Sequence, residues 1–243
     1  MAAIRLHTRT VPILRLMEPT SIEEALAAAE TALARGEGLS GTGFWKAVAR
    51  VKADPDLVDH YADRIAAVDR AAFERWALLK VPIGIGTTLA IVATAVGLGL
   101  IGWSYYTESE LVTVLLFYAG FAALLVTTHG LGHLLVGRMV GIRFTHWFIG
   151  TIARPQPGVK VDYASYLRTP PMSRAWMHAS GAIATKAMPF LLLGAVFAAG
   201  LPAWAIWLLV AVGVVMIVTD IAWSTKSSDW MKFRRERAFA QAP

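Results

Sequence analysis

Cysteine is absent from the 243-residue chain, and charged residues make up only 16% of it. The absence of cysteine excludes disulfide bonds, a thiolate nucleophile and any metal site with cysteine ligands. A soluble domain usually carries about 25% charged and about 45–50% apolar residues, whereas this chain is 56% hydrophobic. The composition therefore excludes an ordinary water-soluble globule, a disordered chain and a nucleic-acid-binding domain. It indicates that many apolar side chains face lipid.

The sequence does contain four apolar stretches, each long enough to cross about 30 Å of hydrocarbon. They cover approximately residues 81–103, 111–136, 175–200 and 202–223. We therefore expect an all-α membrane protein whose membrane domain, residues 80–243, has four transmembrane helices. Membrane lipid is its expected partner, and nucleic acid is not.

Lysine and arginine are distributed unevenly between the connections. Of 23 such residues, 11 lie in residues 1–80, six lie between Arg138 and Arg174, and five lie between Lys226 and Arg237. The short connection 104–110 has none. Because positive charge accumulates on cytoplasmic loops, we expect a multi-pass protein of the cell membrane with both termini and the long middle loop in the cytoplasm.

The first 79 residues are not membrane-like, and they predict a small cytoplasmic helical domain. Ser21 with Glu24 forms a capping-box pattern that opens one helix, and FWKAVARVK predicts a second. Asp54 followed by Pro55 is typical of the start of a longer third helix. In the middle loop, IRFTHWFIG alternates like a strand and PQPG predicts a turn, so we expect a short β-hairpin there.

Ionisable residues inside a membrane span are costly, and this makes them functional candidates. His129 and His133 are four residues apart, so both imidazoles lie on one helix face. His129 and Asp220 each lie 18 residues from the outer end of their span, about 27 Å along a helix, which places them at one depth. Two imidazoles and a carboxylate suit Zn²⁺, with a fourth position left for water. Asp220 is the expected third ligand, and Asp229 is the alternative.

Other interpretations of these polar residues remain open. Histidines near a helix end can simply extend toward the membrane surface. Lys186 can pair with Asp220, which would compete with a metal site and would also suit a transporter. His129 and His178 could instead hold a haem between two helices.

The segment THGLGHLLVGRMVGIRF resembles the metal-binding helix of the site-2 protease family, the membrane-embedded zinc metallopeptidases. In that family the helix carries His-Glu-x-x-His, and His129 and His133 match the two histidines. The segment ASGAIATKAMPF is similar to the family's Gly-Pro-x-x-Asn turn, which implies that Gly181 and Thr185 guide the substrate. The resemblance covers about residues 111–230. It implies an aspartate ligand on a later helix, where Asp220 matches by position without the flanking residues of the usual motif.

The chain departs from the family at Gly130, which stands where the family has its glutamate. That glutamate is the general base for zinc-bound water, so no catalytic base is assigned. The resemblance therefore leaves two functions open. One is an intramembrane zinc metalloprotease that cuts a membrane-anchored substrate, and the other is a non-catalytic pseudoprotease scaffold that binds membrane partners.

Overall fold

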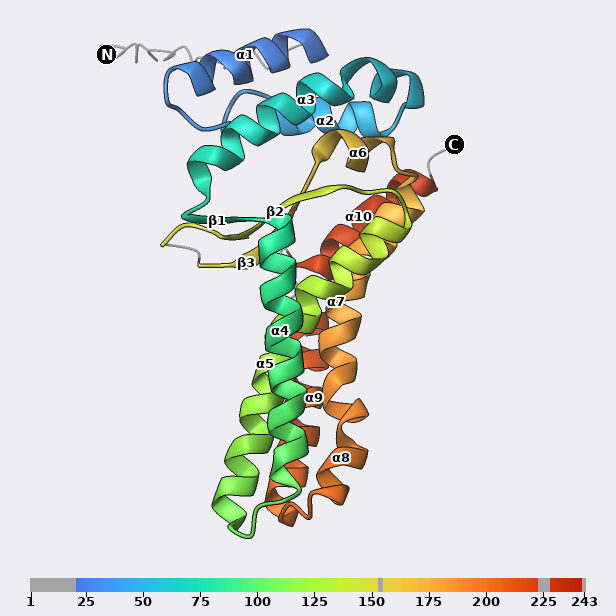
Figure 1. Ribbon diagram of the computed structural model, residues 1–243. Coiled ribbons are helices and arrows are strands. Elements are labelled where there is room, and N and C mark those ends of the chain that lie inside the picture. The colour runs from blue at the N-terminus through green and yellow to red at the C-terminus, as the bar shows by residue number, and fades with distance from the viewer. Residues whose placement is uncertain (1–20, 153–154, 223–227, 242–243) are drawn as a thin grey trace, which may run out of the picture.

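The computed structural model describes residues 21–152, 155–222 and 228–241. Four of its helical segments are long and apolar enough to cross a membrane, as the sequence predicted. They are α4 (Ile83–Ser104), α5 (Glu110–Met139), α7 (Pro171–Leu191) continued by α8 (Leu193–Ala198), and α9 (Ala203–Ala222). They form one bundle, with a small sheet and the remaining helices gathered at one end (Figure 1).

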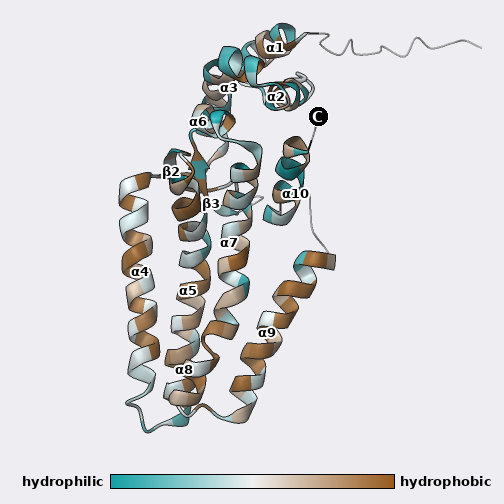
Figure 2. Ribbon diagram, turned by 90° about the vertical axis from the view of Figure 1, so that its right-hand side faces the viewer, coloured by the Kyte–Doolittle hydropathy of each residue, from teal (hydrophilic) through white to brown (hydrophobic). Residues whose placement is uncertain are grey.

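The bundle is apolar both inside and outside. Between its helices, at the end away from the sheet, Phe117, Phe121 and Leu124 of α5 pack against Leu201 and Leu209. Its surface also carries large exposed apolar side chains, and Figure 2 shows apolar residues along the length of α4 and α9. An apolar surface of this extent is suited to lipid rather than water.

The helices α1 (Ile22–Ala34), α2 (Phe44–Lys52) and α3 (Pro55–Trp76) form at the residues that the sequence indicated. The capping box of Ser21 and Glu24 is present, with both hydrogen bonds at 3.1 Å. Asp54 caps α3, and Pro55 is its first residue. The three helices share one buried core, to which the short helix α6 (Tyr163–Arg168) adds Leu167.

The polar end of the bundle holds a three-stranded antiparallel sheet rather than only a hairpin. The order is β1 (Leu79–Pro82), β2 (Phe144–Ile149) and β3 (Pro157–Val161). Two sequence expectations need correction. β1 lies where the first span was expected to begin, because its residues pair with β2 before α4 starts. The expected turn PQPG contributes its last two residues to β3, where they pair with Phe148 and Ile149.

The third expected span is interrupted. Pro189 lies inside α7, which ends two residues later, and α8 follows after Leu192. Proline has no amide hydrogen to donate and its ring clashes with the preceding turn, so a continuous helix to Gly200 is disfavoured. The chain then turns at Gly200, whose φ of 63° is left-handed. The start of α7 at Pro171 is four residues earlier than expected, because proline suits the first turn of a helix.

The last helix, α10 (Asp229–Ala240), lies outside the bundle's apolar part and packs against α7. Its N-cap is Ser228, whose hydroxyl accepts a hydrogen bond from the amide of Met231. Trp230 and Phe233 stack with ring centroids 5.1 Å apart, and Phe233 contacts Trp176 of α7. This packing places the first residue of α10, Asp229, beside α5.

Candidate metal centre

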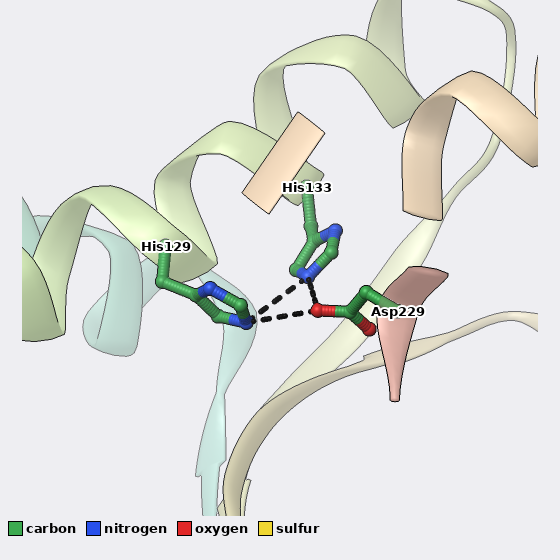
Figure 3. A group of neighbouring side chains, drawn as sticks. All are labelled: His129, His133 and Asp229. Atoms are coloured by element: carbon green, nitrogen blue, oxygen red, sulfur yellow. Dashed lines mark hydrogen bonds and ion pairs between the residues drawn. The ribbon is translucent and has the colours of Figure 1, made fainter. Parts of the chain in front are cut away.

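His129, His133 and Asp229 bring three ligand atoms together at the junction of α5 and α10 (Figure 3). The Nε2 atom of His133 is 3.1 Å from Oδ2 of Asp229, and the Nε2 atom of His129 is 3.2 Å from the same oxygen. The two Nε2 atoms are 3.3 Å apart. These three atoms form a nearly equilateral triangle, and the group could hold a metal ion.

The hydrogen bond on the other side of His133 decides which of its nitrogens is free. Its Nδ1 lies 2.7 Å from the carbonyl oxygen of Met177. A carbonyl only accepts, so Nδ1 carries the proton and donates it. In the neutral imidazole, Nε2 then carries a lone pair that points at the Asp229 oxygen and at His129. A cation between the three atoms removes this repulsion, and a backbone carbonyl behind a metal-bound histidine is a common supporting contact.

Asp229 is held from both sides. Its Oδ1 accepts a hydrogen bond of 3.1 Å from Lys232, while Oδ2 faces the two histidines. Burial alone would raise its pKa, but the contacts with His129 and His133, followed by the charge of Lys232, hold the pKa well below its usual range. Asp229 also opens α10, where the helix dipole favours a negative charge. The carboxylate is therefore ionised and oriented toward the histidines.

The structure brings Asp229, the alternative in the sequence analysis, next to the two histidines, and not Asp220, which was the expected third ligand. Asp220 instead pairs with Lys186, with 2.9 Å between Nζ and Oδ2. Counting residues along a helix predicts depth, but it does not say which face of α9 carries the carboxylate. The contact between Lys186 and Asp220 was itself one of the open interpretations of the sequence.

Gly181 and Thr185 both lie on α7, and Gly181 faces His133. A Cβ atom at Gly181 would come 2.4 Å from Nε2 of His133, so the glycine makes room for the imidazole. The hydroxyl of Thr185 donates to the carbonyl of Gly181 at 2.9 Å and is buried. The structure thus gives Gly181 a close contact with His133 and gives Thr185 a hydrogen bond within α7, and their substrate-guiding role stays a prediction.

Gly130 faces the indole of Trp147, a contact that sequence analysis did not anticipate. A Cβ atom at residue 130 would lie 2.3 Å from Cζ3 and 2.4 Å from Cη2 of Trp147. The indole is fixed from the other side by Gly86, which also leaves no room for a Cβ, and its Nε1 donates to Thr87 Oγ1 at 3.2 Å. The space that a side chain at residue 130 would need is therefore already filled.

His178 lies near the centre but is not part of the triangle. Its Nε2 is 2.9 Å from the hydroxyl of Tyr166, whereas His129 faces Asp229. His129 and His178, the two histidines considered as haem ligands, therefore each contact a side chain of this chain instead.

Comparison with protein-family models, with curated proteins and with solved structures finds no match for this chain. The site must therefore be interpreted from its own residues.

Proposed function

We propose that the protein is a zinc-binding membrane protein whose ion is held by His129, His133 and Asp229. Zinc ligands lie about 2.0–2.2 Å from the ion, so two donors of a tetrahedral site are separated by about 3.3 Å. The three separations here, 3.1, 3.2 and 3.3 Å, are close to that value. Two imidazoles and one carboxylate are a donor set that zinc accepts, with a fourth position left open.

The proposed location is the cell membrane, with both termini and the metal centre on the cytoplasmic side. Four apolar helices support the membrane location. The distribution of lysine and arginine supports the orientation, because the connection between α4 and α5 has neither residue. In this orientation the sheet and the N-terminal helices lie on the cytoplasmic surface.

We infer that the zinc centre binds a membrane-anchored polypeptide rather than hydrolysing it. The observation that carries this inference is the contact between Gly130 and Trp147. In the site-2 protease pattern, residue 130 would be the glutamate that activates water, and here the indole fills that volume. A general base typically contributes about 10²–10⁴-fold in rate, so the centre resembles the protease site in its ligands but lacks its base.

Two features support a polypeptide as the bound group. His129 keeps 38% of its side chain exposed, so the fourth position is open to a carbonyl or carboxylate. Between α5 and α7, a hollow of about 470 Å³ with almost entirely apolar walls includes Gly132, which precedes His133 in the chain, together with Trp176, Ser180 and Ile183. A partner that brings an apolar segment and a polar backbone to this place fits both surfaces.

Metal analysis of the detergent-purified protein tests the zinc proposal. We expect one zinc per chain in the wild type and in D220N, a loss of zinc in H129A and H133A, and weakened but measurable zinc binding in D229N, where both imidazoles remain. The matched control is D220N, because it removes an aspartate carboxylate that pairs with Lys186 and is not one of the three proposed ligands. Equal zinc in wild type and H133A would overturn the proposal and would favour a proton shared among the three side chains.

An active metalloprotease is the second candidate. The exposure of His129 favours it, because water could reach the ion from that side. Cleavage of a membrane-anchored substrate by the wild type, lost in H133A, would support this candidate over a binding function.

A further inference from the structure

The helix that supplies Asp229 is held in place by a buried carboxylate, Glu236. α10 is rich in charged residues, and among its described residues only Phe233 and Glu236 are buried. Glu236 is 1% exposed. Phe233 and the half-buried Trp230 pack α10 against Ala175 and Ala179 of α7, and Glu236 adds the one fully buried charge among the described residues of this helix.

Glu236 joins three separate elements. Its Oε2 accepts a hydrogen bond of 2.8 Å from Nε of Arg174 in α7. Its Oε1 accepts one of 2.5 Å from Nζ of Lys52 in α2. Arg174 is also 1% exposed, and its Nη1 donates to the carbonyl of Leu167 at 2.9 Å. A single side chain therefore ties α10 both to the bundle and to the N-terminal helices.

Aromatic rings lie beside the charged cluster of Glu236, Arg174 and Lys52. The Lys52 ammonium lies 4.8 Å from the centroid of the Tyr166 ring, and it also faces Tyr163 and Phe239. Two cations and one carboxylate share a place with little access to water. Removing the carboxylate would leave two buried positive charges without a counter-ion, which is strongly unfavourable.

Helix geometry connects this cluster to the metal centre. Asp229 and Glu236 are seven residues apart, so they lie on nearly the same face of α10, about 10 Å apart along its axis. The contacts of Glu236 thus add to the packing of Phe233 in setting the rotation of α10 about its axis and its position along it. These two quantities decide whether Oδ2 of Asp229 faces His129 and His133.

We propose that Glu236 is a positioning residue for the metal centre. Through α10 it holds Asp229 in place, and through Lys52 it makes the metal affinity depend on the helices α1–α3. This inference rests on the proposed zinc function, and it adds a role for the N-terminal domain.

The test is a double-mutant cycle on the zinc affinity of the full-length protein in detergent, measured by competition with a chelator. We expect E236Q to bind zinc roughly 10-fold more weakly, in the range that loss of a supporting contact usually costs a metal site. If Glu236 acts through Asp229, the same substitution made in D229N produces no further loss. The matched control is R237Q, a charge removal at the exposed neighbouring position of α10, which should bind like the wild type.

K52M is the second variant, because it keeps the pair of Glu236 and Arg174 and removes only the link to α2. It should weaken zinc binding in the wild type by less than E236Q does, and it should have no effect in D229N. If E236Q does not fold, the zinc affinity of K52M, with and without Asp229, tests the proposal alone. Wild-type affinity in K52M and E236Q, or an equal loss with and without Asp229, would overturn the proposal. Failure of the zinc function itself is distinguishable, since H133A and D229N would then bind like the wild type.

Discussion

The indole of Trp147 lies directly against the Cα of Gly130, and a Cβ atom placed there would be 2.3 Å from the ring. The contact joins a strand of the sheet to the helix that carries both histidines. It also means that the glutamate of the protease pattern cannot be restored by one substitution.

The first prediction concerns this contact. G130A should lower the free energy of unfolding by roughly 1–3 kcal/mol, because an extra methyl group in a packed site forces its neighbours apart. Alanine is otherwise favoured over glycine in a helix by about 1 kcal/mol. Thermal unfolding in detergent measures the effect. The control is G99A in α4, where a Cβ would meet nothing within 4 Å, and it should be neutral or slightly stabilising.

The second prediction concerns whether a glutamate at residue 130 can restore peptide cleavage. G130E alone should be poorly folded, whereas G130E with W147A has room for the carboxylate beside His129. We expect cleavage of a membrane-anchored substrate to rise above the wild-type level only in the double variant. Activity in the single variant G130E would show that the indole does not block the position.

The third prediction concerns the space under His133. G181A should weaken metal binding by about 10–100-fold, the range found when the surroundings of a ligand are disturbed, because its Cβ would come 2.4 Å from Nε2. Metal affinity from chelator competition is the measurement. G194A in α8 is the matched control, since a Cβ there meets nothing within 4 Å. Equal affinities for the two variants would contradict the contact.

The fourth prediction separates Asp220 from the metal centre. K186M leaves Asp220 without its partner in an apolar region, where an isolated charge costs roughly 2.5–3.5 kcal/mol. The double variant K186M/D220M should be more stable than K186M, because replacing both members of a pair by apolar groups is often neutral. Both variants should keep their zinc. Loss of zinc in the double variant would return Asp220 to the ligand set.

The fifth prediction is a pH dependence that comes from Lys52. Burial lowers its pKa from 10.5 to about 8, and the charge of Glu236 offsets this only in part. Between about pH 8 and 10, the unfolded chain therefore binds more protons at this residue than the folded protein does. Stability from this group rises with pH in that window. The thermal midpoint of the wild type should therefore rise relative to that of K52M between about pH 7.5 and 9.5. Parallel pH profiles of the two midpoints would argue against a lowered pKa of Lys52.

Much of the framework could be predicted from local sequence. Four long apolar runs, the capping box at Ser21 and the proline after Asp54 are signals carried by neighbouring residues, and the structure has helices at all of them. The pair of His129 and His133 was visible for the same reason, because four residues make one helical turn.

The rest of the site depends on contacts between distant parts of the chain. Residue counting predicted that Asp220 lies at the depth of His129, but it could not predict that Asp220 pairs with Lys186, which lies 34 positions earlier on another helix. Trp147 contacts Gly130 only because β2 passes beside α5. No residue near Gly130 in the sequence indicates that contact. Strand β1 was missed because four residues that end in proline give no alternating pattern of their own.

The proposed ligands His133 and Asp229 are separated by 96 positions, and Asp229 lies beyond the last of the four apolar helices. During synthesis the two histidines leave the ribosome long before the aspartate does. A complete set of donors exists only after α9 has been inserted and α10 has folded back onto α7. Capture of an ion would therefore act as a late check on assembly, stabilising only those copies whose final segment has found its place.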